Sequence, residues 1–345
     1  MMCSTVSRRR TIAARACGRI GLTAALSFVA LAALPAIAHA RTALPATTGA
    51  QATAGAPATI ATHAEAAAAH ELVFVRDGNV LLLGGGAEKP LTTGGGAARP
   101  RWSPDGKRIA YLLKNRLWVM NADGTGRRDL GAHASGGADW SPDGKWLAFA
   151  APGCTGGPVV YRVATSGEAK PEVLFPAECK GQPLPTEKPE PARGGTLSER
   201  IAVDDTVSWA PDGKRIAFRG GMCESIYDAC LTIGTVAGAG ERAVATFGGG
   251  GQQSGSASVP SWRPDGARLT WTAGGSTKLT VIEYDPATGG KRTLGKPGDR
   301  ELSYRTARTA YLTGERDGRS WIFQLDPAGS TRTALRQGSQ PDPRP

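Results

Sequence analysis

The chain of 345 residues contains four copies of one short sequence, of which the first is Arg101-Trp102-Ser103-Pro104-Asp105-Gly106-Lys107-Arg108-Ile109-Ala110-Tyr111. The later copies begin at Trp140, Trp209 and Trp262. Self-similarity at a period of tens of residues indicates a repeat architecture, in which each copy is one structural unit. The sequence therefore predicts a fold assembled from repeated units around these segments.

Each copy predicts a β-hairpin with a defined turn. Pro104 presets φ at the second turn position, Asp105 is tolerated at the third, and Gly106 takes the left-handed position of a type I turn plus bulge. Because the aspartate recurs at one turn position, we interpret it as a turn residue and not as an acid–base catalyst. We assign the tryptophans to packing between repeats. The structural turn residues are Trp102, Asp105 and Gly106; Trp140, Asp143 and Gly144; Trp209, Asp212 and Gly213; and Trp262, Asp265 and Gly266.

Two further strands follow each hairpin. Apolar segments at 117–120, 159–163, 231–236 and 279–282 predict a third strand, and short segments such as 128–130 and 292–294 predict a fourth. Four antiparallel strands per repeat describe one blade of a β-propeller.

The repeat resembles the PD40 (WD40-like) repeat of TolB-like six-bladed β-propellers, whose hallmark is the same Trp-Ser-Pro-Asp-Gly-Lys turn. The resemblance covers roughly residues 71–340 and implies an all-β fold of six four-stranded antiparallel blades. We expect a propeller over 71–345, with blades starting near 71, 99, 137, 203, 259 and 299. In the sixth blade Tyr304 stands where tryptophan is expected. The α/β domain that precedes the propeller in TolB has no counterpart in this sequence. The resemblance therefore implies the propeller fold, but it does not imply a role in the Tol system.

The first blade lacks its innermost strand in the sequence. Propellers commonly close by borrowing this strand from the other end of the chain. The tail at 337–343 loosely echoes 96–100, which leads into the second blade, and is one candidate donor. The segment at 59–62 is the other candidate, and the sequence leaves both open.

The first 40 residues predict a signal peptide. Arg8, Arg9 and Arg10 begin a basic region, residues 20–37 are uncharged and apolar, and Ala38-His39-Ala40 is a cleavage motif. An uncleaved membrane anchor is the alternative, since about 18 apolar residues just span a bilayer. Residues 41–70 are rich in Ala and Thr and predict a disordered linker. We therefore expect an exported protein, periplasmic or secreted, with no stable membrane insertion after cleavage.

The charge and the cysteine content narrow the possible classes of protein further. The formal charge is +11, but part of it lies in the signal, and the other Lys and Arg residues are scattered, which disfavours nucleic-acid binding. Four cysteines remain after cleavage, an even number that indicates two disulfides in an exported chain. The preferred pairing joins Cys154 to Cys179 and Cys223 to Cys230, within the loops of single blades. Zinc is disfavoured because no Cys-x-x-Cys pair occurs.

The sequence offers no recognisable catalytic centre. It contains no Gly-x-Ser-x-Gly motif, its 4 histidines are too few for a catalytic cluster, and its glycine runs lack the Gly-Lys-Ser/Thr ending of a phosphate-binding loop. We therefore predict a protein that is not an enzyme and needs no cofactor.

The long connections are the candidate binding surface. They fall at 151–158, 176–197, 220–230 and 247–258, and all join strands on the face opposite the tight turns. Loops on a rigid scaffold often carry binding, so we predict a partner surface around Glu224, Tyr227 and Asp228. The alternative is that these segments are only longer solvent loops.

These observations favour a monomeric, exported, non-catalytic scaffold that binds a protein partner in the cell envelope or outside the cell. One alternative is a small-ligand or glycan binder that uses the central channel. The other is a metal-dependent hydrolase of the six-bladed type, which would need clustered carboxylates and histidines in the channel.

Overall fold

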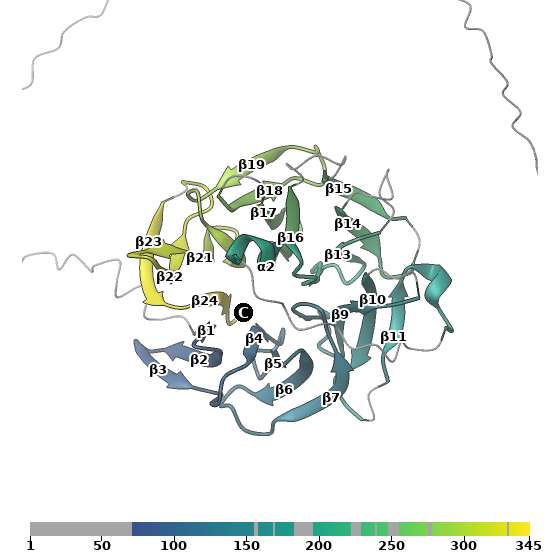
Figure 1. The fold of residues 1–345 in the computed structure, drawn as a ribbon, viewed down its shortest axis with the longest axis horizontal. Helices are drawn as coiled ribbons and strands as arrows, with labels where there is room; N and C mark the ends of the chain where they lie inside the picture. Colours follow the sequence, from purple (N-terminus) through teal and green to yellow (C-terminus); the bar gives the residue numbers. More distant parts are fainter. Residues whose placement is uncertain are drawn as a thin grey trace, which may run out of the picture. The chain divides into compact units, whose positions relative to one another are not determined.

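The computed structural model describes residues 71–345, except 155–157, 168–169, 183–195, 222–228, 239, 248–254, 275–277 and 330. In these residues the chain forms six antiparallel sheets of four strands each, arranged around a central axis (Figure 1). This is the predicted six-bladed β-propeller. The predicted signal peptide and linker lie outside the described residues.

The strands follow one another around the ring in chain order. Blade 1 comprises β1 (Leu72–Arg76), β2 (Asn79–Gly84), β3 (Ala87–Pro90) and β24 (Ser339–Pro343); blade 2 comprises β4 (Ala97–Trp102), β5 (Arg108–Leu113), β6 (Arg116–Asn121) and β7 (Arg128–His133); blade 3 comprises β8 (Asp139–Trp140), β9 (Trp146–Pro152), β10 (Pro158–Ala164) and β11 (Glu172–Phe175).

The second half of the ring repeats this pattern. Blade 4 comprises β12 (Ser208–Trp209), β13 (Arg215–Arg219), β14 (Ala229–Thr235) and β15 (Arg242–Phe247); blade 5 comprises β16 (Ser256–Trp262), β17 (Leu269–Gly274), β18 (Thr280–Tyr284) and β19 (Lys291–Leu294); blade 6 comprises β20 (Arg300–Thr306), β21 (Thr309–Arg316), β22 (Arg319–Leu325) and β23 (Arg332–Gln337).

The repeated turn folds as its residue types require. Oδ1 of Asp105 accepts hydrogen bonds from Ser103 Oγ (2.6 Å) and the Lys107 amide (3.1 Å), and Gly106 has a φ of 63°. Asp143, Asp212 and Asp265 accept the equivalent amide bonds. The bonds from Ser103 and Lys107 lower the pKa of Asp105, so its carboxylate stays ionised. The four aspartates therefore organise turns.

The ring closes through the carboxyl-terminal tail. β24 is the innermost strand of blade 1 and pairs antiparallel with β1, placing Pro343 opposite Leu72 and Asp342 opposite Val73. Beyond the strand, the Arg344 amide donates to Glu71 O at 2.9 Å. Of the two candidate donors, the tail provides the missing strand.

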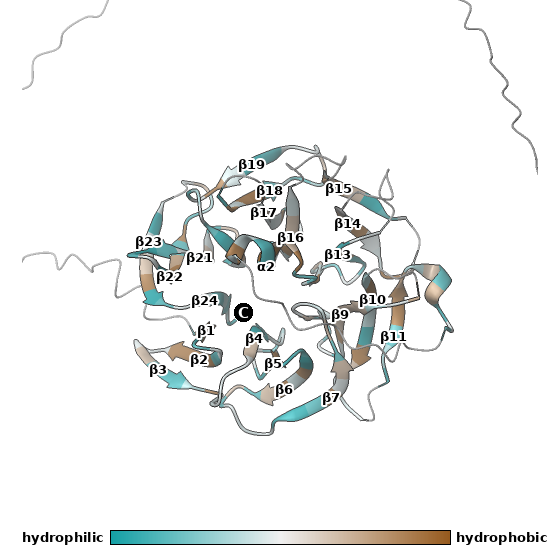
Figure 2. Ribbon diagram, viewed as in Figure 1, coloured by the Kyte–Doolittle hydropathy of each residue, from teal (hydrophilic) through white to brown (hydrophobic). Residues whose placement is uncertain are grey.

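The hydrophobic core lies between the blades. Each of six clusters draws its side chains mainly from two neighbouring sheets; one joins Trp102 of blade 2 to Val73 and Leu91 of blade 1. The outer strands β3, β7 and β23 are largely hydrophilic, whereas strands in the middle of a blade, such as β9 and β14, are largely apolar (Figure 2). Arginines add a second contact between blades, since the Arg108 guanidinium lies 4.7 Å from the ring centroid of Trp140 in the next blade.

One long connection contains helical structure that the sequence analysis treated as loop. The 3₁₀ helix η1 (Ala177–Cys179) follows β11, and helix α2 (Leu197–Ala202) precedes blade 4. The Thr196 side chain accepts the Glu199 amide, and the Glu199 carboxylate accepts the Thr196 amide, which is a capping box. No helix among the described residues is long and apolar enough to cross a membrane. α2 lies close to the axis in Figure 1.

Candidate binding site at the mouth of the central channel

Bulges in four of the innermost strands determine which side chains point into the site. Arg99, Val259, Glu301 and Gln340 have φ values of 51°, 52°, 55° and 55°, and the strand register shifts close to each of them. Each lies three residues before the tryptophan of its blade or before the residue in the equivalent place. A bulge re-aims a side chain within a strand. Arg99, Glu301 and Gln340 line a cavity.

This cavity has a volume of about 610 Å³. Its lining comes from the inner ends of several blades, from α2, from Ser320 at the start of β22, and from connections such as Asn115 and Ser135. These connections join the second strand to the third, or one blade to the next. The cavity therefore opens on the face that carries the long loops, opposite the Asp-Gly turns. Its volume is within the usual range for small-ligand sites.

Arg99 is the hub of the charged groups at the mouth. It is 7% exposed, and its Nε and Nη2 donate to Asp204 Oδ2 at 2.9 and 2.5 Å. Its Nη1 donates to Glu301 Oε1 at 2.8 Å, and its amide donates to Gln340 Oε1 at 2.7 Å. The hub thus joins blade 2 to blade 6, to the closing strand β24 and to the segment after α2.

The ion pairs determine the charge state of the mouth. Burial acts to raise the pKa of Glu301, but the guanidinium groups of Arg99 and Arg300 outweigh burial and lower it. Asp205 differs, because burial raises its pKa to about 6 although Arg219 donates to it at 2.6 Å. Arg300 is 2% exposed and donates to Ser320 Oγ at 2.8 Å; it forms no ion pair with a described residue.

A second layer of polar contacts joins the blades beneath the hub. Asp342 accepts hydrogen bonds from Arg101 Nη1 (2.7 Å), Ser303 Oγ (2.8 Å) and the Trp102 amide (2.7 Å). Asp139 accepts the Trp209 amide at 2.7 Å in the same way. Burial raises the pKa of Asp139 to about 6, and Arg101 opposes this rise. Each of four residues in this layer directly precedes the tryptophan of its blade or the residue in the equivalent place: Arg101, Asp139, Ser303 and Asp342.

Apolar groups complete the mouth. Val203, directly after α2, is 56% exposed, the only large hydrophobic side chain so exposed in the described part of the chain. Leu197 and Ile201 of α2 line the same cavity. No group of three or more His, Cys, Asp or Glu side chains among the described residues is placed to hold a metal ion. The mouth thus combines three apolar side chains, of which Val203 is exposed, with fixed charges, as ligand sites commonly do.

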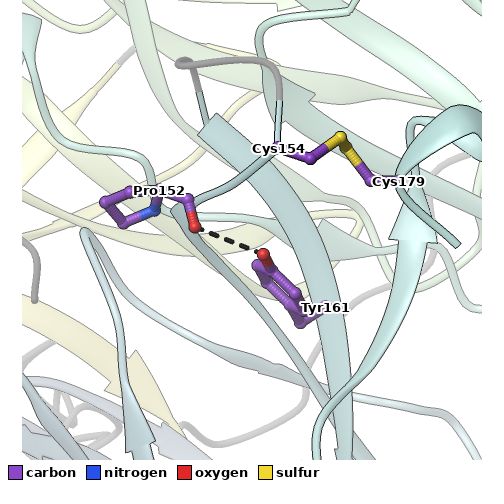
Figure 3. The surroundings of a disulfide bond; sticks show 4 residues. All are labelled: Pro152, Cys154, Tyr161 and Cys179. Carbon is purple, nitrogen blue, oxygen red and sulfur yellow. Dashed lines mark hydrogen bonds between the residues drawn. A yellow bond between two sulfur atoms is a disulfide. The ribbon is translucent and has the colours of Figure 1, made fainter. Parts of the chain in front are cut away.

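The predicted partner-binding residues Glu224, Tyr227 and Asp228 lie outside the described residues. Arg219, at the end of the strand that leads into their loop, lines the cavity. A disulfide joins Cys154 to Cys179, with Tyr161 beside it donating to Pro152 O (Figure 3). It ties the β9–β10 connection to η1. Cys230 is also disulfide-bonded, and its predicted partner Cys223 lies outside the described residues.

The sequence analysis missed Arg99, Asp204 and Glu301. The positions of Arg99 and Glu301 follow from a simple signal, because they lie three residues before Trp102 and Tyr304. The capping box at Thr196–Glu199 was the corresponding signal for α2. Neither signal identifies the partners of Arg99, which are 105 and 202 residues away in the sequence.

Several solved structures share this fold. TolB from Acinetobacter baumannii matches with a TM-score of 0.60 and 17% identity, over 81% of this chain and 67% of that one. A putative TolB from Agrobacterium tumefaciens matches with a TM-score of 0.53 and 14% identity, over 78% and 90%. A chain of a nidogen–laminin complex matches with a TM-score of 0.55 and 11% identity, over 80% and 98%.

No protein-family model matches the sequence, and no curated protein matches it. At these identities the structural matches establish the fold. The chain folds as a TolB-like six-bladed β-propeller.

Proposed function

We propose that this chain is an exported, non-catalytic scaffold that binds a protein partner at the channel mouth. The observation that carries the proposal is the mouth itself, where the exposed Val203 lies beside the buried Arg99–Asp204–Glu301 network. Leu197, Ile201 and Val203 form an apolar part of the mouth beside these fixed polar groups, and binding surfaces commonly combine an apolar centre with a polar rim. The nidogen–laminin complex provides a case in which a protein of this fold was crystallised in a protein complex.

The charged groups support binding over catalysis. Arg99 and Arg219 both engage carboxylates, so the carboxylates at the mouth are already occupied by internal ion pairs. A catalytic acid or base needs a proton-transfer position within hydrogen-bond reach of a substrate. A preformed, cross-linked surface also loses little conformational entropy when a partner binds. The disulfide between Cys154 and Cys179 supports the same reasoning for the loops of blade 3.

The test compares two faces of the propeller. The mature chain, residues 41–345, is used to capture a partner from secreted and envelope proteins of the source organism, and affinity for the purified partner is then measured. Val203→Glu is expected to weaken binding about tenfold or more, as truncation of a central contact does. Lys145→Glu, at an exposed turn of the opposite face, is expected to leave the affinity unchanged.

The predicted loop residues form a second arm of this test. Alanine at Glu224, Tyr227 and Asp228 is expected to weaken binding if the partner spans the mouth and the β13–β14 loop. If both this triple variant and Val203→Glu bind the partner as the wild type does, the proposed surface is wrong.

A small-ligand or glycan site in the same cavity is the second candidate. The observation that favours it is a cavity of about 610 Å³ with the buried Arg300 in its lining. Thermal stabilisation by individual sugars or short peptides distinguishes the two functions. A scaffold shows none with free sugars, whereas a glycan site raises the midpoint of unfolding with ligand concentration.

A further inference from the structure

A second cavity lies on the outer side of the ring, between blades 4 and 5. It has a volume of about 610 Å³ and shares no lining residue with the channel mouth. We propose that this groove, between the edge strands β15 and β19, binds an extended acidic peptide of a partner protein, which adds to β15 as a fifth strand. The proposal is independent of the function assigned to the channel mouth.

The backbone of β15 faces the groove. Five consecutive residues, 243–247, line it. Successive side chains of a strand point to opposite faces, so an uninterrupted run shows that the strand edge itself borders the space. β15 is the last strand in the order β12-β13-β14-β15, and no strand of the described part of the chain pairs with its outer edge. Such an edge presents free amide and carbonyl groups for strand addition.

The floor of the groove is a row of side chains on blade 5. Trp271 lies opposite Ile282, and Ile282 lies opposite Thr293, so the three share one face of the sheet. The equivalent row in blade 3 is Phe149, Tyr161 and Val173.

The two rows differ in how they fill the space between blades. In blade 3 the rings of Phe149 and Tyr161 stack at 5.6 Å, and Tyr161 is 3% exposed. In blade 5 Ile282 replaces that tyrosine and is only half-buried. The indole Nε1 of Trp271 is buried and has no hydrogen-bond partner among the described residues. The smaller side chain leaves a space that an apolar side chain of a bound strand would fill.

The charge of the groove selects an acidic strand. Lys291 and Arg292 line it, and no carboxylate does. Arg292 pairs with Glu283 at 2.5 Å, on the face of the sheet opposite Ile282 and Thr293, so Lys291 is the cation on the groove face. Lys291 is exposed and forms no ion pair with a described residue; its Nζ lies 5.7 Å from the ring centroid of Trp271. A strand that alternates acidic and apolar residues would place carboxylates near Lys291 and apolar groups over the floor.

The probe is a labelled peptide, acetyl-Asp-Ile-Asp-Phe-Asp-Ile-amide, titrated into the purified protein by fluorescence polarisation. Ile282→Tyr restores the residue of blade 3 and is expected to weaken binding about tenfold by filling the groove. Lys291→Glu is expected to weaken it about fivefold or more, because it introduces a like charge. Lys89→Glu, on the outer strand β3, is the matched control and is expected to change nothing. Circular dichroism confirms that each variant is folded.

Two further measurements identify the mode of binding. Peptide methylated at alternate backbone nitrogens is expected to lose binding, and hydrogen exchange is expected to slow at the amides of β15. The proposal is overturned if the wild type does not bind at millimolar peptide, or if the lysine counterpart of the peptide binds equally well. It is also overturned if Ile282→Tyr binds as the wild type does, or if the protected amides lie at the channel mouth.

Discussion

The hydroxyl of Tyr304 donates a hydrogen bond of 2.7 Å to Oε1 of Glu283, a carboxylate that is 2% exposed. Burial and the neighbouring Glu283 raise the pKa of Tyr304, so the hydroxyl stays protonated and remains a donor. Tyr304 occupies the place that tryptophan holds in the other repeats and packs between blades 5 and 6. The irregular sixth blade therefore has its own polar contact at this interface.

Tyr304→Phe is expected to lower the free energy of unfolding by about 1.5–3 kcal/mol, because a buried charged acceptor loses a donor. Tyr304→Trp is expected to be destabilising too. The indole Nε1 of Trp102, Trp209 and Trp262 is buried without a partner among the described residues, so an indole at position 304 is not expected to replace the hydrogen bond to Glu283. Urea unfolding measures both. Tyr161→Phe, which loses only a bond to a carbonyl, is the control and is expected to cost about 0.5–1.5 kcal/mol. Equal losses of unfolding free energy in Tyr304→Phe and Tyr161→Phe would contradict the role of Tyr304 as a donor to the buried Glu283 carboxylate.

The closing strand depends on Asp342. Asp342→Ala is expected to cost about 3–5 kcal/mol, because it leaves the largely buried Arg101 guanidinium and the Trp102 amide without this acceptor. The control is Glu172→Ala, which removes a pair with Arg162 whose carboxylate is 52% exposed and is expected to cost at most about 1 kcal/mol. Chemical denaturation compares the two. Similar stabilities would show that β24 does not close the ring through this carboxylate.

Asp139 predicts a pH dependence of stability. Its pKa is raised from 3.8 to about 6 in the folded protein, so the folded state holds this proton more tightly than the unfolded chain does. The stability that Asp139 contributes is therefore present at low pH and falls as the pH rises from about 4 to about 6. The difference in unfolding free energy between wild type and Asp139→Asn should fall over this interval.

The control for this prediction is Asp105→Asn. The turn hydrogen bonds lower the pKa of Asp105, so its contribution is lost as the pH falls through the folded pKa, below its ordinary value of 3.8. The difference between wild type and Asp105→Asn should thus stay constant between pH 4 and 7, and should change only below about pH 3.8, with a slope opposite to that of Asp139→Asn. A difference for Asp139→Asn that is constant between pH 4 and 7 would falsify the proposed burial effect.

The close packing around Gly136 leaves no room for a larger side chain at this position of the channel mouth. A Cβ at this position would lie 2.3 Å from the Thr206 amide nitrogen and 2.7 Å from Asp204 Oδ1. Gly136→Ala is expected to cost about 1–3 kcal/mol by overpacking and to displace Asp204 from Arg99. Gly329→Ala is the control, because its nearest contact would be 3.5 Å. Thermal unfolding measures both, and a Gly136→Ala protein as stable as the control would contradict the packing argument.

The repeated turn and the strand pattern were predictable because local interactions produce them. Pro104, Asp105 and Gly106 specify the hairpin within a few residues, and alternation specifies which strand face is buried. From these signals the six blades follow, and so does the place of Tyr304 as a substitute for tryptophan. Helix α2 carried a local signal as well, in the capping box of Thr196 and Glu199.

The sequence alone determined the blade, the number of blades and the residues of the turns. The tertiary structure decided which end of the chain closes the ring, and it decided that Arg99 meets Asp204 and Glu301. Those contacts join residues 105 and 202 positions apart. No local rule relates such positions, because they become neighbours only when the blades close around a common axis and the inner strands point their bulged residues into one small space.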